Sequence, residues 1–486
     1  MRQTIVYKEW LPDQPELGSE ALIRADNVLP SEGTYVPFRP LTPIQSGSFT
    51  LPGIARGGFV SQRENAISGA VEYYAATNST IYVATAGAGV GTFNAISSGW
   101  GTANSEVSFT QFGNLVFAGR GNGGVLYHTA GSATNFATVP GLTAAYDARH
   151  LAVLGQFLVI GNLGSATARS ANIAWSGVGQ PLSFPTPNSA TAIAQQSGEQ
   201  ELNIADGPLI GIYGGDQYAI LVQTGAVTRM TYVGPPVVFQ FDKIENKKGA
   251  AREWAHAGSG RNVFMFSPDG FYVTDGVTVE PTGEGKVNKT FINALDIDRT
   301  PGSVTATSII EGAYDCKSRC IFWATPSGAT ASAYSNYIYA HSLVDGRWTR
   351  CEQSMRKFIE PASAVQADGL YAFDSSNVLC KFSGTAGSAV FETSDAEFNP
   401  GGRSYIDGIK PNVQSSGTAP AMTTRIGYRD DLNTDPTYTS ATSANSYNGF
   451  ADFRVDAKYV RVEQTITGNF EKATGFVASF DQSSDR

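Results

Sequence analysis

Residues 262–281, NVFMFSPDGFYVTDGVTVEP, constrain the fold of this chain more than any other segment. Three short apolar runs, VFMF, FYVT and VTVE, are separated by S-P-D-G and D-G, which leaves no room for a helix between them. Proline fixes φ for a turn, and glycine adopts the positive φ that tight hairpins need. The segment therefore predicts a small antiparallel meander, which cannot bury its own faces alone.

Similar strand-like cores recur along the chain and start at Thr80, Asn114, Phe157, Tyr218, Asn262, Cys320 and Leu370. Successive starts lie 34 to 61 residues apart, and one blade of a β-propeller takes about 40–50 residues. We predict an all-β chain built on a β-propeller of about six blades, chosen from a count of six or seven meanders. A stack of β-sandwiches is the alternative.

The pattern of strands and turns divides the chain into three parts. Residues 1–60 carry closely spaced prolines and little alternation, so they predict an extended N-terminal arm in which residues 20–27 could form two helical turns. Residues 61–387 hold the meanders and predict the propeller, with one short helix over residues 287–295. Residues 388–486 have longer, more polar strands around a polar loop at 430–447, which predicts a β-sandwich-like C-terminal domain.

Four apolar residues of the arm are candidates for an interface. The arm is too hydrophobic and too interrupted by proline to be a free tail. We therefore expect these four residues to dock on the propeller or on a neighbouring subunit: Trp10, Leu11, Leu17 and Leu29.

The charge balance restricts the possible partners. The formal net charge is −9, and nucleic-acid-binding surfaces need clustered Lys and Arg. Charged residues make up only 16% of the chain, which favours a surface that meets other protein. Residues 1–10 lack the apolar core of a signal peptide, and no run approaches the roughly 18 apolar residues of a membrane span. We expect synthesis in the cytoplasm.

The sequence contains no catalytic set, and we predict no enzymatic activity, no cofactor and no metal. The C-x3-C pair Cys316 and Cys320 lacks nearby partners for a zinc site, so buried thiols are the simpler interpretation. Asp296 and Asp298 lack the glycine and glutamate of a calcium loop. We expect the four histidines to be surface or turn residues: His128, His150, His256 and His341.

Residues 119–124, GRGNGG, match the pattern G-x-G-x-x-G. They lie between two strand-like segments, and no helix follows to offer its N-terminus to a pyrophosphate. We interpret the segment as a hairpin turn.

Several segments resemble the nozzle or packaged-DNA-stabilisation proteins of short-tailed bacteriophages. They are WLPDQPELG at 10–18, GEGKVNKTFINALDID at 283–298, DCKSRCIFWA at 315–324, FNPGGRSYIDGIKP at 398–411 and FRVDAKYVRVEQTITGNFEKATG at 453–475. The resemblance covers the chain from end to end through loose motifs. It implies a structural virion protein at the distal end of the tail, made in the bacterial host cytoplasm.

The same resemblance implies the partners. They are further copies of this chain in a homo-hexamer, a tail adaptor or tubular protein, and tail fibres. Double-stranded DNA would pass through the channel of the ring without specific binding.

Two other functional classes fit the residues. A carbohydrate-binding or carbohydrate-degrading propeller, such as a receptor-binding protein, would need two carboxylates held close together. A cytosolic scaffold with a propeller interaction face is the third class.

Overall fold

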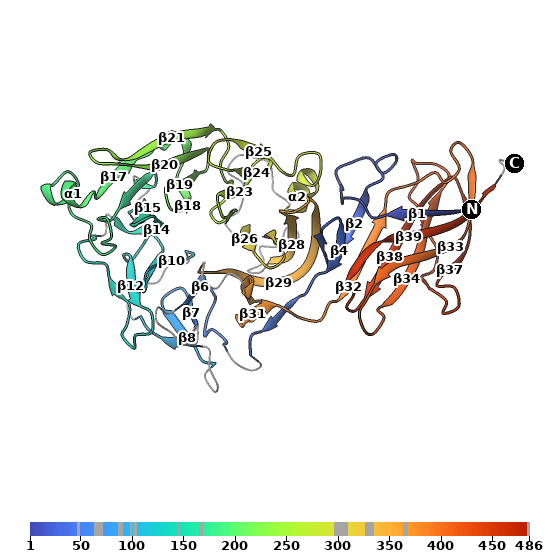
Figure 1. Cartoon of the computed structure of the whole chain (residues 1–486), viewed down its shortest axis with the longest axis horizontal. Helices are drawn as coiled ribbons and strands as arrows, with labels where there is room; N and C mark the ends of the chain where they lie inside the picture. Colours follow the sequence, from blue (N-terminus) through green and yellow to red (C-terminus); the bar gives the residue numbers. More distant parts are fainter. Residues whose placement is uncertain are drawn as a thin grey trace.

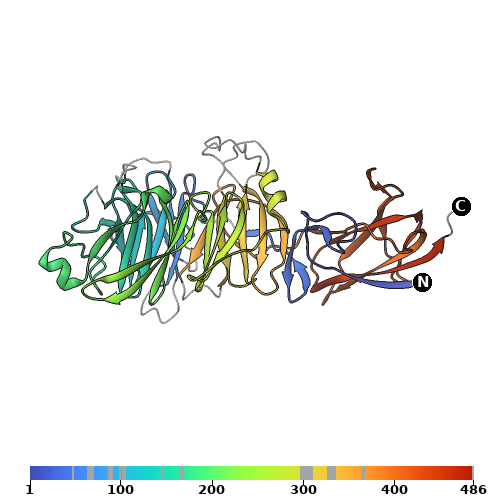
Figure 2. The ribbon, with the colours of Figure 1, turned by 90° about the horizontal axis from the view of Figure 1, so that it is seen from above.

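The structure is a computed structural model, and it describes residues 1–45, 49–62, 71–85, 91–97, 100, 105–143, 146–164, 169–295, 310–325, 335–362 and 368–483. Almost all of its regular structure is β-strand. A propeller and a β-sandwich follow one another along the long axis (Figures 1 and 2). The predicted all-β class with a propeller and a sandwich-like domain is confirmed.

Five consecutive antiparallel sheets of four strands surround one axis (Figure 1). The five sheets are β6 (Gly57–Gln62), β7 (Val71–Ala76), β8 (Ile81–Thr85) and β9 (Asn94–Ala95); β10 (Ser108–Phe112), β11 (Leu115–Gly119), β12 (Leu126–Thr129) and β13 (Ala137–Thr138); β14 (Ala148–Leu154), β15 (Phe157–Leu163), β16 (Asn172–Trp175) and β17 (Gly198–Glu201); β18 (Leu209–Tyr213), β19 (Tyr218–Gln223), β20 (Ala226–Gly234) and β21 (Val238–Asn246); β22 (His256–Ser259), β23 (Asn262–Ser267), β24 (Gly270–Thr274) and β25 (Val279–Pro281). The meander expected at residues 262–281 is the last three strands of the fifth sheet. Gly276, with φ of 87°, provides the turn after β24.

A single long strand, β29 (Trp348–Pro361), connects the sixth and seventh blades. Its first half pairs with β28 (Ser335–Ser342) at the outer edge of the sixth blade, which also contains β26 (Glu311–Asp315) and β27 (Cys320–Thr325). Its second half is the inner strand of the seventh blade and pairs with β30 (Tyr371–Asp374), which in turn pairs with β31 (Leu379–Phe382).

The N-terminal segment closes the ring. Strand β5 (Leu41–Pro43) pairs with β31 and is the fourth, outermost strand of the seventh blade. Residues 360–361 of β29 then pair in parallel with β6 of the first blade. Within the described residues the propeller therefore has seven four-stranded blades, one more than the number favoured from the meanders. The count of six or seven meanders allows this number. The choice of six assigns the first or last meander to flanking structure, whereas the last meander, β30 and β31, is completed as a blade by β5 from the other end of the chain.

The sandwich is also built from both chain ends. One sheet runs β3 (Val28–Ser31), β4 (Thr34–Pro37), β39 (Lys472–Ser483), β33 (Arg403–Gln414) and β37 (Ala451–Ala457), and β1 (Arg2–Val6) pairs with β39. The other sheet runs β2 (Leu22–Asp26), β32 (Ser388–Thr393), β38 (Tyr459–Thr467) and β34 (Ala421–Arg429), with β35 (Thr437–Tyr438) and β36 (Thr442–Ser443) on β34.

The arm is therefore not a separate extended segment. Its strands β1 to β4 belong to the sandwich and β5 to the propeller, and the expected boundary at residue 61 lies inside β6. The two helical turns expected over residues 20–27 are wrong, because this segment forms β2. Backbone pairing of β2 with β32 replaces the local helical bonds.

Helices are short. The structure has α1 (Ala190–Gln195), α2 (Asn288–Ala294) and a 3-10 turn at Ile204–Asp206. The helix expected at 287–295 is confirmed by α2. Its Phe291 is buried in a core cluster that continues from the propeller into the sandwich. The two lobes therefore share one hydrophobic core at their junction.

Candidate functional site

The inner strands of the seven blades enclose a central cavity of about 400 Å³. Its wall is formed by β6, β10, β14, β18, β22, β26 and β29, together with Trp254 from the segment before β22. Because each inner strand alternates its side chains, every second residue of the wall projects toward the axis. We take this cavity as the first candidate site.

A buried lysine ties three parts of the cavity wall together. Lys357 Nζ on β29 lies 2.7 Å from Glu311 Oε1 on β26 and 3.5 Å from Glu106 Oε2, which precedes β10. Glu311 Oε2 also accepts the backbone N–H of Phe358 at 3.1 Å. Burial alone would lower the pKa of Lys357, but the two carboxylates raise it. Burial raises the pKa of Glu311, and Lys357 and the amide of Phe358 offset part of that rise. The 2.7 Å contact with Lys357 and the bond from the amide favour the ionised pair.

Glu360 lies three residues further along β29 and also lines the cavity. Its side chain is accessible from the cavity, but the protein around it partly removes it from bulk water, and this desolvation raises its pKa to about 7. The Glu311 carboxylate adds to that rise and Lys357 opposes it. Glu360 is therefore the cavity carboxyl whose charge changes near neutral pH.

His256 joins the fourth and fifth blades. Its Nε2 lies 2.5 Å from the carbonyl oxygen of Ile210, so this nitrogen is assigned the hydrogen, and Nδ1 accepts from the hydroxyl of Tyr213, also at 2.5 Å. Burial lowers the pKa of His256 to about 4, with His150 adding to the effect, so the imidazole is neutral at pH 7. A Cβ at Gly211 would lie 2.8 Å from His256 Nε2, which explains the glycine at that position.

Trp254 has strained backbone geometry beside the cavity. Its φ of 72° is rare for a bulky residue, and such outliers concentrate at functional sites. The indole lies over Lys357 Nζ, 4.3 Å from the ring centroid. Its N–H and the Nε2 atom of buried His150 make no hydrogen bond in the described structure. The cavity therefore presents polar atoms that water or a small polar molecule could satisfy.

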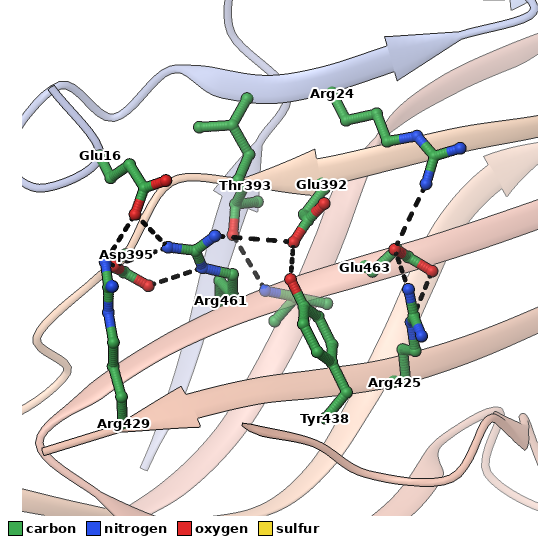
Figure 3. Close-up of polar contacts among 12 residues, drawn as sticks. Glu16, Arg24, Glu392, Thr393, Asp395, Arg425, Arg429, Tyr438, Arg461 and Glu463 are labelled. Atoms are coloured by element: carbon green, nitrogen blue, oxygen red, sulfur yellow. Dashed lines mark hydrogen bonds and ion pairs between the residues drawn. The ribbon is translucent and has the colours of Figure 1, made fainter. Parts of the chain in front are cut away.

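The second candidate site is a charge network where the N-terminal segment meets the sandwich (Figure 3). Glu16 accepts hydrogen bonds from Arg429 at 2.6 Å and from Arg461 at 2.7 Å. Asp395, at the end of β32, receives Arg461 Nε and a terminal nitrogen of Arg461, both at 2.8 Å, and also contacts Arg429. The side chain of Asp395 is 1% exposed.

The network continues across the same sheet (Figure 3). Arg425 makes a bidentate pair with Glu463 at 2.7 and 2.6 Å, and Arg24 of β2 approaches Glu463 at 3.7 Å. The N-terminal segment is thus held to β34 and β38 by charges of both signs.

The same segment also holds the propeller. Asp13 accepts the backbone N–H groups of Lys289 and Thr290 at 2.8 and 2.9 Å. These are first-turn donors of α2, whose N-cap residue Val287 makes no side-chain cap bond. Gln14 donates to the carbonyl of Gly285 at 2.6 Å. Residues 13–16 therefore connect α2 of the propeller to the sandwich.

The four interface candidates of the arm lie within the chain's own junction or beside it. Trp10 is buried, donates from its indole to the carbonyl of Ile23 and packs 6.1 Å from Tyr339. Leu29 is buried in the core of the sixth and seventh blades. Leu11 and Leu17 are half-buried. The docking expected on the propeller is therefore made within the same chain, and a contact with a neighbouring subunit stays a prediction.

The histidine expectation is wrong, because all four histidines are buried: His128, His150, His256 and His341. Each lies in a strand, where its ring packs against aromatic neighbours. The sequence offered a signal, since each follows or precedes apolar strand residues.

The other motifs are turns or thiols. Residues 119–124 connect β11 to β12, as expected for a hairpin turn. Cys320 is buried, Cys316 is half-buried and both are free thiols. Asp296 and Asp298 lie outside the described residues. No cluster of metal-binding residues and no helix long and apolar enough to span a membrane occurs in the part of the chain that the structure describes.

Sequence reasoning missed the residues that form both sites. Glu311 stands on β26, whereas Lys357 and Glu360 stand on β29, and no motif connects the two strands. The only local signal was the placement of charged residues inside strands that are otherwise apolar.

Comparisons with known proteins give little further information. No protein-family model and no curated protein matches the chain. Among solved structures, PorZ, a surface component of the type-IX secretion system of Porphyromonas gingivalis, is 10% identical with a TM-score of 0.38 over 71% of this chain. The chain spans 44% of PorZ. An exo-β-1,3-galactanase from Phanerochaete chrysosporium is 10% identical with a TM-score of 0.30, over 78% of this chain and 96% of that enzyme.

Proposed function

We propose that the chain is a structural protein of a short-tailed bacteriophage tail. In this proposal several copies, six by the family resemblance, form the distal nozzle that closes the DNA channel and opens for genome ejection. The tail adaptor or tubular protein and the tail fibres are the neighbours.

One observation carries the proposal. Two of the segments that resemble nozzle proteins, residues 10–18 and 283–298, are far apart in sequence but meet at the junction of the two lobes. Asp13 of the first segment caps α2 of the second, and Gln14 bonds to Gly285. Lys286 of the second pairs with Glu9 at 2.7 Å. Two of the segments that carry the resemblance therefore take part in the contact that holds the propeller and the sandwich together.

The central cavity supports a structural role over a catalytic one. Both oxygens of Glu311 are engaged, one by Lys357 and one by the amide of Phe358. A carboxylate held in this way is a poor nucleophile or base. The ion pairs connect β29 to β26 and to the segment before β10, which suits a rigid scaffold.

The shape and surface also suit a ring. A ring requires two different surfaces of each subunit to meet around an axis. The subunit is elongated, with the propeller at one end and the sandwich at the other (Figure 2). The polar loop at 430–447 extends from the sandwich and ends at Tyr447, which is 98% exposed. We propose this loop as one contact surface, and the net charge of −9 would limit adhesion of DNA.

Size and imaging measurements test the proposal. Native mass spectrometry of the purified chain should show rings, alone or with candidate tail proteins, and Tyr447→Asp should weaken them. Tyr405→Asp is the matched control, because Tyr405 is exposed on β33 outside the loop. Imaging of intact particles should place the protein around the tail axis. Density away from that axis, or a single copy at a fibre tip, would refute the nozzle.

A carbohydrate-degrading or carbohydrate-binding propeller is the second candidate. It is favoured by the presence of Glu311 and Glu360 in one cavity, with the pKa of Glu360 raised to about 7 as a general acid needs. Turnover of a bacterial surface glycan, abolished by Glu360→Gln, would establish it. Unchanged glycan with the folded chain would remove the hydrolytic version.

A further inference from the structure

A second cavity, of about 560 Å³, opens on one face of the third to fifth blades. Among the described residues, its wall comes from the start of β14, Asn162 and Gly164 at the end of β15, Ser170 before β16, the residues before and at the start of β18, Thr224 after β19 and the residues before β22. A volume of this size lies within the range of small-molecule sites. Neither the nozzle nor the glycan hypothesis uses it.

Arg252 in this wall has no side-chain partner among the described residues. The side chain makes no hydrogen bond, ion pair or ring contact within the described residues, although it is half-buried. The neighbouring Glu253 is engaged by Arg149 at 3.3 Å and lies 3.7 Å from His150. Burial lowers the pKa of Arg252, and no nearby carboxylate opposes that shift.

An unpaired guanidinium in such a place needs an explanation. A partly desolvated charge without a partner destabilises the fold. The chain has 43 acidic against 34 basic residues, so carboxylates are not scarce. Arg425, Arg429 and Arg461 of the sandwich are all paired with carboxylates.

The rest of the wall contains polar and apolar residues. Asn162, held at φ of 57° and bonded to the carbonyl of Leu209, is polar, as are Ser170 and Thr224. Ile204, Pro208 and Ile210 are apolar, and Ile204 is exposed. The cavity thus offers one uncompensated positive charge next to apolar surface.

We propose that this cavity binds a small organic molecule through one oxyanion group, a carboxylate or a phosphate, that pairs with Arg252. Guanidinium presents two parallel N–H donors that match either group. The body of the ligand lies on Ile204, Pro208 and Ile210. This inference is independent of the nozzle proposal.

The test uses three probes on the full chain: benzoate, phenyl phosphate and the neutral benzyl alcohol, each at constant ionic strength. Isothermal titration calorimetry should detect binding of one or both anions and not of benzyl alcohol. Arg252→Ala should weaken that binding at least tenfold, and Arg252→Lys should recover part of it. Arg261→Ala is the matched control, since Arg261 is an exposed arginine near the same blade, and it should leave binding unchanged.

The two anionic probes distinguish the head group, and either one supports the proposal. Arg252→Ala should melt at or above the temperature of the parent, because it removes an unpaired charge. Absence of binding by both anions, or equal affinity in Arg252→Ala, would overturn the inference. Equal binding of benzyl alcohol would also overturn it, because the site would then be merely apolar.

Discussion

The buried carboxylate of Asp395 gives the sharpest test of how the two chain ends are held together. It sits between Arg429 and Arg461, and Glu16 is a second carboxylate that pairs with both guanidinium groups. Arg429 also donates to the carbonyls of Leu432 and Thr434, and Arg461 lies 3.8 Å from Glu392. Asp395→Asn keeps the size of the side chain and removes its charge. Glu16, which is half exposed, would then be the one carboxylate bonded to both arginines. The amide group of asparagine would also place its N–H donors against the N–H donors of the arginines.

The expected loss is about 3 kcal/mol, the low end of the roughly 3–5 kcal/mol for breaking a buried ion pair, because asparagine still accepts one hydrogen bond. For a domain of this size, about 3 kcal/mol lowers the melting temperature by about 6–12 °C. Asp456→Asn is the matched control in the same lobe. Its carboxylate pairs with Arg403 at 3.3 Å but is 44% exposed, so we expect about 0–1 kcal/mol.

Scanning calorimetry at pH 7 measures both variants. The pH dependence adds a second readout. Burial alone would raise the pKa of Asp395, but Arg461 and Arg429 hold it below its usual value. The carboxylate therefore stabilises the fold above about pH 4, and this contribution is lost as the pH falls through its lowered pKa. The difference between parent and Asp395→Asn should shrink in that range. Equal losses for Asp395→Asn and Asp456→Asn at pH 7 would refute the reasoning.

Three further predictions concern the propeller. Acidification from pH 6.5 to 4 should lower the melting temperature of the propeller. Burial lowers the pKa of His150 to about 3 and that of His256 to about 4, so these histidines take up protons in the unfolded chain before they do so in the folded chain. A melting temperature that does not change with pH would contradict this. Glu360→Gln should stabilise the chain at pH 8 and have little effect at pH 5. The folded chain loses stability as the pH rises toward 7 and Glu360, with its pKa raised to about 7, has to ionise. Equal thermal shifts at both pH values would argue against a raised pKa. Asp13→Ala should cost about 1 kcal/mol in chemical denaturation through loss of the α2 cap, whereas Asp275→Ala, at an exposed turn, provides the comparison.

Turn chemistry made the meanders predictable, because it acts between neighbouring residues. The segment S-P-D-G at 267–270 can do little other than reverse the chain, and β23, β24 and β25 are where the pattern put them. Helix α2 was predictable from a pattern that is likewise local, the spacing of apolar residues over one or two helical turns. Residues 20–27 show the limit: the spacing of Ala21, Leu22 and Ala25 fits a helix as well as a strand, and the neighbouring β32 decides between them.

The candidate sites were less accessible from the sequence. Lys357 on β29, Glu311 on β26 and Glu106 before β10 meet because the blades surround one axis. Glu16 lies beside Asp395 because both chain ends enter one sandwich. Residue types alone do not specify such pairings, since any of the chain's acidic residues could neutralise a given cation.

The sequence by itself determined the strand class, the turns and the division between short and long strands, since these follow from backbone preferences over a few residues. Only the tertiary structure decided that β5 completes the seventh blade and that β1 to β4 complete the sandwich. Edge strands have unpaired N–H and C=O groups that any compatible strand can satisfy. Which strand does so depends on the packing of the whole chain, because the partners are separated by hundreds of residues and are selected by the shared core at the junction.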